Sequence, residues 1–217
     1  LDDVLNGFYS SSLVVIAGRP TMRADSLIYK MIGNWILSKN FNILLFTTQN
    51  EYKKFEDHLL SRLCGITSDE VLRFYQKKSA TEVYARYEEA EKLLRNEASE
   101  LFTEIPNESM VSFTEMYSRS LQVMREKSIH AIVIDGYHFI DYGKDDDIRN
   151  IAKSLKELAT RLDVPVIVNV PLPSKKGMPR PKLSDLGRYE TQIDWDIYSD
   201  VILGVTATDI DNCAFEH

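Results

Sequence analysis

The stretch that decides the fold covers residues 14–26 and reads Val-Val-Ile-Ala-Gly-Arg-Pro-Thr-Met-Arg-Ala-Asp-Ser. An apolar run leads into Gly18, as it does at the start of a phosphate-binding loop, whose pattern is G-x-x-x-x-G-K-[ST]. Arg23, Ala24 and Asp25 stand where this pattern has Gly, Lys and Ser or Thr. The segment therefore predicts a strand, a loop and a helix. They are either the remnant of a nucleotide site or an ordinary connection.

Each replacement removes one part of phosphate binding. Arg23 adds a bulky side chain where glycine lets the backbone wrap around phosphates. Ala24 lacks the positive charge that Lys brings to the β- and γ-phosphates. Asp25 puts a carboxylate at a helix start that otherwise attracts anions, and it replaces the hydroxyl that helps to hold Mg²⁺. The residues of this degenerate site are Gly18, Arg19, Pro20, Thr21, Met22, Arg23, Ala24 and Asp25. We expect no bound nucleotide there, and at most a small anion near Arg19 or Arg23.

Length and composition are typical of a globular α/β protein. The chain has 217 residues, of which 44% are hydrophobic and 27% charged, so it can form a single domain over residues 1–217. The net charge of −7 argues against a uniformly basic nucleic-acid surface, although a local basic loop stays open.

The remaining composition bears on metal binding and cellular location. The two cysteines and four histidines show no metal-ligand spacing, so we expect no metal. Few cysteines, no signal peptide and no membrane-length apolar run predict a cytoplasmic protein without membrane contact. The first residue is Leu1, not Met, which predicts a fragment or an excised domain.

Apolar runs alternate with helical patterns along the chain. The runs rich in Val, Ile and Leu are Leu13–Ala17, Ile43–Phe46, Ala131–Ile134, Val164–Val170 and Val201–Val205. The helical patterns are Ser26–Ser38, Glu51–Leu63, Thr81–Phe102, Ser112–Lys127 and Asp147–Leu162. Ser112 to Glu115 also resembles a capping box. This alternation predicts a mostly parallel sheet flanked by helices on both faces.

Polar residues at the ends of these runs are candidates for chemistry. Asp135 directly follows an apolar run, where a P-loop ATPase keeps a carboxylate for Mg²⁺, or where an Asp merely caps a turn. Gln49 follows the second run, where a carboxylate could activate water; an amide only orients it. Lys175, Lys176, Arg180 and Lys182 form a basic loop that either contacts DNA phosphates or is simply solvated.

Taken together, these segments resemble the C-terminal, RecA-like ATPase domain of DnaB-type replicative DNA helicases. Leu1–Phe8 is similar to the segment before the family's first core strand. The motif matches are Gly18–Met22 with A/G-R-P-S-M, Ile43–Gln49 with a strand ending F-S-L-E, Val133–Tyr137 with V-I-D-Y-L, Ile151–Ile167 with I-S-R-S-L-K-x-L-A-x-E-L-x-V-P-V-I, Arg180–Leu186 with R-P-x-x-S-D-L/I, and Ser199–Ile202 with D-A-D-I-V. The resemblance implies a RecA-like P-loop NTPase fold, with ATP and Mg²⁺ as cofactors.

The departures from the family pattern fall on its chemistry. The resemblance puts Gln49 at the catalytic Glu and Asp135 at the Walker B Asp. Val170 and Pro171 replace the family's S-Q sensor pair. The arginine-finger segment of the family lies beyond the last residue of this sequence.

Two functions follow from this mixture. The first is a non-catalytic module in DNA replication, a pseudoenzyme that binds a helicase or loader protein, its own copies or single-stranded DNA. The second is an active ATP-dependent helicase domain that unwinds duplex DNA as a hexamer. We favour the first, because matched core segments accompany lost chemistry.

Overall fold

Six strands, most of them apolar, form one sheet in which all neighbouring strands run parallel. The structure, a computed structural model, describes residues 7–19, 24–39, 41–47, 49–64, 81–93, 102–106, 111–141, 148–173, 182–186 and 193–206. In spatial order the strands are β3 (Phe102–Pro106), β2 (Ile43–Thr47), β5 (Ala131–Ile134), β7 (Val166–Pro171), β1 (Leu13–Gly18) and β8 (Val201–Val205). The predicted parallel sheet is therefore confirmed.

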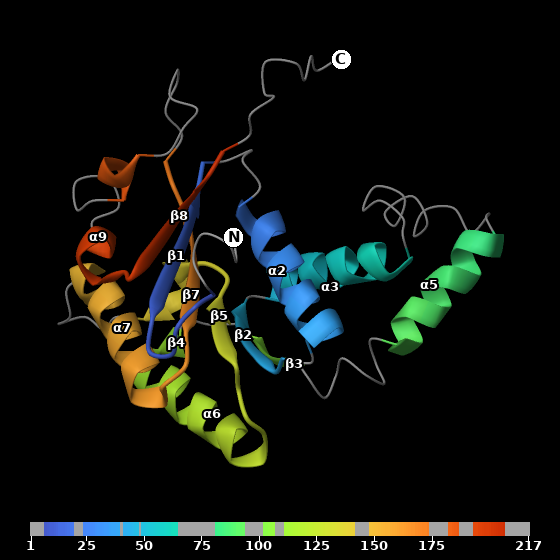
Figure 1. Ribbon diagram of the computed structural model, residues 1–217, viewed down its shortest axis with the longest axis horizontal. Helices are drawn as coiled ribbons and strands as arrows, with labels where there is room; N and C mark the ends of the chain where they lie inside the picture. Colours follow the sequence, from blue (N-terminus) through green and yellow to red (C-terminus); the bar gives the residue numbers. More distant parts are fainter. Residues whose placement is uncertain are drawn as a thin grey trace.

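Helices cover both faces of this sheet (Figure 1). Those packed on the sheet are α2 (Ala24–Lys39), α3 (Gln49–Cys64), α6 (Phe113–Glu126), α7 (Ile151–Leu162) and the short α9 (Trp195–Tyr198), whereas α5 (Thr81–Leu93) packs against α3. Successive side chains of a strand point to opposite faces. Val15 of β1 accordingly packs in a core with residues of α6 and α7, whereas Val14 packs with α2 and α3. Two separate apolar cores thus hold the sheet between its helices.

Short elements complete the described fold. The 3-10 turns are η2 (Tyr137–Phe139), η3 (Ile148–Asn150) and η4 (Leu183–Asp185), and a small second sheet pairs β4 (Val111–Ser112) with β6 (Ile140–Asp141). Ser112 caps α6, because its Oγ accepts a hydrogen bond from the Glu115 backbone N–H at 3.2 Å. This contact is the Ser112 half of the predicted capping box.

One predicted helix is wrong at its end. The helical pattern over Thr81–Phe102 predicts a helix or a helix pair that reaches Phe102, but Phe102 begins β3. The partner strand decides the conformation here, since β3 pairs residue by residue with β2, Phe102 opposite Ile43. Pro106 ends the strand, and a proline without an N–H is tolerated on such an outer strand.

Where the strands begin, polar side chains hold β1, β8 and α7 together. Lys156 of α7 donates hydrogen bonds from Nζ to Asp200 Oδ1 and Oδ2, at 2.9 and 2.7 Å, and to the Ser11 carbonyl at 2.8 Å. Asp200 Oδ2 also accepts from the Leu13 backbone N–H at 2.6 Å. We call this group, Ser11, Leu13, Lys156 and Asp200, the amino edge.

The opposite ends of the strands point to one border of the sheet, although β5 ends at the level of Val168, three residues before the end of β7. Gly18 at the end of β1 is opposite Pro171 of β7 and Val205 of β8, and Ile134 of β5 is opposite Val168 of β7. Residues that directly follow β1, β5 and β7 therefore meet at one border of the sheet, which we call the carboxyl edge. It is at the top of Figure 1, where α2 begins.

Candidate functional site

The carboxyl edge is where ligands bind in open parallel α/β sheets. β1 ends there at Gly18, and Asp135 directly follows β5, with its backbone N–H bonded to the Phe46 carbonyl at 2.9 Å. The structure thus places Gly18 and Asp135 at the same border of the sheet. Pro20, Thr21, Met22 and Arg23 lie outside the described residues.

The first turn of α2 holds the two replaced loop positions that the structure describes. Ala24 begins the helix and is only 8% exposed, and it packs in the apolar core formed with β1 and α3. Asp25 follows in the first turn. A carboxylate at this place stabilises the helix through its dipole and also repels an approaching anion.

Asp135 is buried in a network of side-chain hydrogen bonds. The Tyr29 hydroxyl donates to Asp135 Oδ2 at 2.6 Å, and Asn169 Nδ2 donates to Asp135 Oδ1 at 3.0 Å. Both oxygens of the carboxylate therefore accept a bond from a neutral group. Tyr29 comes from α2 and Asn169 from β7, so the network joins three elements.

Arg19 takes part in a buried ion pair. Its Nη2 lies 2.6 Å from Asp185 Oδ2 in an ion pair, and its Nη1 donates to the Pro173 carbonyl at 2.6 Å. Both charged side chains are about 5% exposed or less, so the pair is buried. Asp185 belongs to η4, which makes the guanidinium a link between the end of β1 and the loop around η4. The Arg19 guanidinium is therefore bound by a protein carboxylate and a backbone carbonyl.

Gly136 shapes the turn after Asp135. Its φ is +101°, a conformation that favours glycine, and an added Cβ would lie 2.5 Å from the His138 ring. The resembled V-I-D-Y-L motif has Tyr at this position. The turn after the strand therefore differs from the family pattern.

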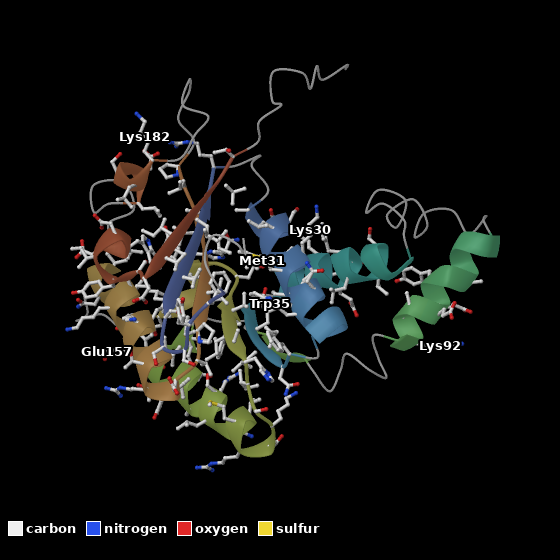
Figure 2. All side chains as sticks on the ribbon, viewed as in Figure 1. Lys30, Met31, Trp35, Lys92, Glu157 and Lys182 are labelled. Carbon is white, nitrogen blue, oxygen red and sulfur yellow. The ribbon has the colours of Figure 1, made fainter. Side chains whose placement is uncertain are left out.

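The other predicted site residues are described in part. Gln49 begins α3, two residues after the end of β2, and its side chain lies outside the described part. Lys175, Lys176 and Arg180 also lie outside it. Lys182 is exposed at the carboxyl edge (Figure 2), where its backbone N–H donates to Asp185 Oδ2 at 2.9 Å.

Sequence reasoning missed the contributions of Tyr29, Asn169 and Asp185. Tyr29 follows Asp25 by one helical turn, and residues at this spacing lie on one face of a helix. That spacing places Tyr29 on the side of α2 that Asp25 faces, but it does not identify Asp135 as the partner. Asn169 is a polar residue in an otherwise apolar strand, which marks a buried polar contact. Asp185 carried no signal of its own beyond its place in the R-P-x-x-S-D-L match.

The described residues lack two other features. No group of three or more His, Cys, Asp or Glu side chains there is arranged to hold a metal ion. None of the described helices combines the length and the apolar character needed to cross a membrane.

Comparisons with known proteins agree with the resemblance. The family model described as "DnaB-like helicase C terminal domain" matches residues 1–212. The chain is 27% identical over 194 residues to the replicative DNA helicase DnaB of Nostoc sp., covering 86% of this chain and 21% of the relative. For the DnaB of Geobacillus stearothermophilus the identity is 23%, over 86% of this chain and 41% of the relative. The chain therefore spans less than half the length of these relatives.

Solved structures show the same fold. One of them, described as an ATPase domain, superimposes with a TM-score of 0.76 at 22% identity, over 90% of this chain and 69% of that domain. A second structure is described as that of a DnaB-like replicative helicase and its interactions with primase. It superimposes with a TM-score of 0.76 at 22% identity, over 90% of this chain and 47% of that chain.

Proposed function

Because this chain belongs to the DnaB-like helicase C terminal domain family, we propose that it acts in DNA replication as a RecA-like binding module that does not hydrolyse ATP. The observation that carries the proposal is the burial of Ala24. At the position where a P-loop has its phosphate-binding Lys, the chain has a methyl group packed in an apolar core. The position serves packing, which leaves the loop without its main cation.

The donor set at the carboxyl edge does not fit a magnesium–nucleotide complex. Ala24 and Asp25 supply neither a cation for phosphate nor a hydroxyl for Mg²⁺. Asp135, the remaining candidate ligand, accepts hydrogen bonds at both of its oxygens, from Tyr29 and Asn169. We therefore derive no step of a reaction through ATP or Mg²⁺.

The expected loss of rate is large. Gln49 cannot take a proton from water, and the loop lacks the charge that stabilises a transferring phosphoryl group. Losing both removes several kcal/mol of transition-state stabilisation, or factors of about 10³ or more. A ring of identical copies does not restore activity, because every copy carries the same substitutions.

The proposed partners are proteins of a replicative helicase assembly, either a related helicase, its loader or further copies of this chain. Single-stranded DNA is a weaker second partner, bound through phosphates by Lys175, Lys176, Arg180 and Lys182. Replacing all four with Ala should abolish low-salt binding of single-stranded DNA. Equal affinity in both proteins would exclude this loop as the contact.

Family membership supports the alternative of an active helicase domain. Asp135 stands at the end of a buried strand, as that alternative requires. ATP hydrolysis by the purified protein separates the two functions, with the Asp135→Asn variant as the background control. We expect equal rates in both proteins, with and without single-stranded DNA. Hydrolysis by the wild type above that control would overturn the proposed function.

The binding half of the proposal has its own test. The wild type is mixed with the full-length Geobacillus stearothermophilus relative, and complexes are measured by analytical ultracentrifugation. A mixed complex or a self-assembled ring supports the module, whereas a monomer in every mixture contradicts it.

A further inference from the structure

Tyr29 lies in the second turn of α2, close to the loop that the P-loop pattern covers. It lies one helical turn after Asp25, which stands at the Ser/Thr position of the P-loop pattern. Helical side chains lean toward the amino end of their helix, so a long side chain at Tyr29 extends toward the loop that precedes α2. Its hydroxyl ends at Asp135 Oδ2, 2.6 Å away.

The contact is buried and firmly held. Tyr29 is 3% exposed and Asp135 is 4% exposed. The Tyr29 ring packs edge-on against Phe55 at 5.4 Å and lies 5.8 Å from the His58 ring, and both partners belong to α3. On the other side of the carboxylate, Asn169 fixes Oδ1. Packing thus keeps the hydroxyl on Asp135, where an O–H···O⁻ bond is strong.

We propose that the Tyr29 hydroxyl takes the place of a divalent cation at Asp135 and locks this edge closed to metal ions. A buried carboxylate needs donors or a cation to offset its desolvation. Tyr29 and Asn169 supply neutral donors, so the edge is held together with no metal and no nucleotide. The lock deepens the proposed function and rests on it, because it explains how the fold remains intact without its ligand.

The test measures Mn²⁺ binding directly, through loss of the electron paramagnetic resonance signal of the free ion. The proteins are the wild type, Tyr29→Ala, the double variant Tyr29→Ala with Asp135→Asn, and Tyr117→Ala as a matched control. Tyr117 is a half-buried tyrosine of α6 that packs in the other core. Removing the Tyr29 side chain should tighten the apparent dissociation constant for Mn²⁺ by roughly tenfold or more over the wild type.

The tighter Mn²⁺ binding of Tyr29→Ala should vanish when Asp135→Asn is added, and Tyr117→Ala should bind Mn²⁺ as the wild type does. Binding by Tyr29→Ala no tighter than by the wild type overturns the lock, and so does a gain that survives Asp135→Asn. Neither result bears on the proposed function, which fails if the wild type hydrolyses ATP or forms no assembly.

Tyr29→Phe keeps the ring contacts with Phe55 and His58, so this variant tests the hydroxyl without removing the packing of the side chain. A low-field hydroxyl proton resonance in the wild type should disappear in Tyr29→Phe and shift in Asp135→Asn. A wild-type spectrum without that resonance contradicts the lock, because a short buried hydrogen bond protects its proton from exchange.

Discussion

The amino edge and the carboxyl edge of the sheet differ in how fully their residues match the family motifs. At the amino edge, Lys156 and Asp200 lie in segments that match family motifs, and they bind each other and the start of β1. At the carboxyl edge, Arg19 and Asp185 also lie in matched segments and form a buried ion pair. Ala24, in contrast, stands at a position where the pattern contacts phosphate. In these segments the chain thus matches the family motifs at side chains that hold the fold, and it departs from the pattern at a loop position.

The largest effect should come from the buried pair at the carboxyl edge. Asp185→Asn leaves the Arg19 guanidinium buried without a counter-charge, which should lower the free energy of unfolding by about 3–5 kcal/mol. Urea denaturation measures the change. The double variant Arg19→Met with Asp185→Leu should lose much less, because it buries no unpaired charge. A loss below about 1 kcal/mol in Asp185→Asn would show that the pair is not structural.

The next effect concerns the Tyr29 contact. Tyr29→Phe removes a hydrogen bond to a buried carboxylate and should lower the free energy of unfolding by about 1.5–3 kcal/mol. Tyr117→Phe controls for the loss of a tyrosine hydroxyl from a partly buried site. In an Asp135→Asn background the effect of Tyr29→Phe should shrink. Equal effects in both backgrounds would disconnect Tyr29 from Asp135.

The amino edge should respond less to loss of its charge. The Lys156 and Asp200 side chains are 32% and 41% exposed, so solvent screens their attraction. Lys156→Met should therefore lower the free energy of unfolding by about 0.2–1 kcal/mol, and less at high salt. Thermal unfolding at two salt concentrations measures this. A loss as large as that of Asp185→Asn would remove the contrast between the edges.

The smallest effect is a pH dependence on α3, the helix against which Tyr29 packs. Burial raises the pKa of the Asp57 carboxyl above its ordinary value of 3.8, and Lys53 partly offsets the rise. A raised pKa means that the folded state holds the proton more tightly, so stability is lost as the pH rises through this pKa. Asp57→Asn should be more stable than the wild type at pH 7, by no more than about 0.5 kcal/mol. The difference should disappear at acid pH, and a gain that persists there would assign the effect to packing.

The fold was predictable from sequence because its strands carry continuous apolar runs. Val14 and Ile16 of β1, for example, belong to a strand that is buried on both faces of a parallel sheet, and such a strand reads as an unbroken apolar run. Phe102–Pro106 escaped prediction because Glu104 and Pro106 interrupt its apolar character, and pairing with β2 decides its conformation.

The sequence predicted the position of site residues only where the order of strands and helices determines it. Asp135 could be assigned to the carboxyl edge because it directly follows an apolar run. Its contact with Tyr29 joins residues 106 positions apart, and the Arg19–Asp185 pair joins residues 166 positions apart. Side-chain partners at such separations depend on tertiary packing, which no local pattern encodes. A tyrosine on an amphipathic helix predicts only a core position.

The central claim is that the carboxyl edge keeps its architecture without binding nucleotide. Equilibrium titration of the wild type with fluorescently labelled ATP and Mg²⁺ tests it, with the full-length Geobacillus stearothermophilus relative as the positive control. A variant with Arg23→Gly, Ala24→Lys and Asp25→Thr asks whether the loop alone prevents binding. We predict no saturable binding by the wild type up to about 1 mM ATP. A wild-type dissociation constant in the micromolar range or tighter would contradict the account.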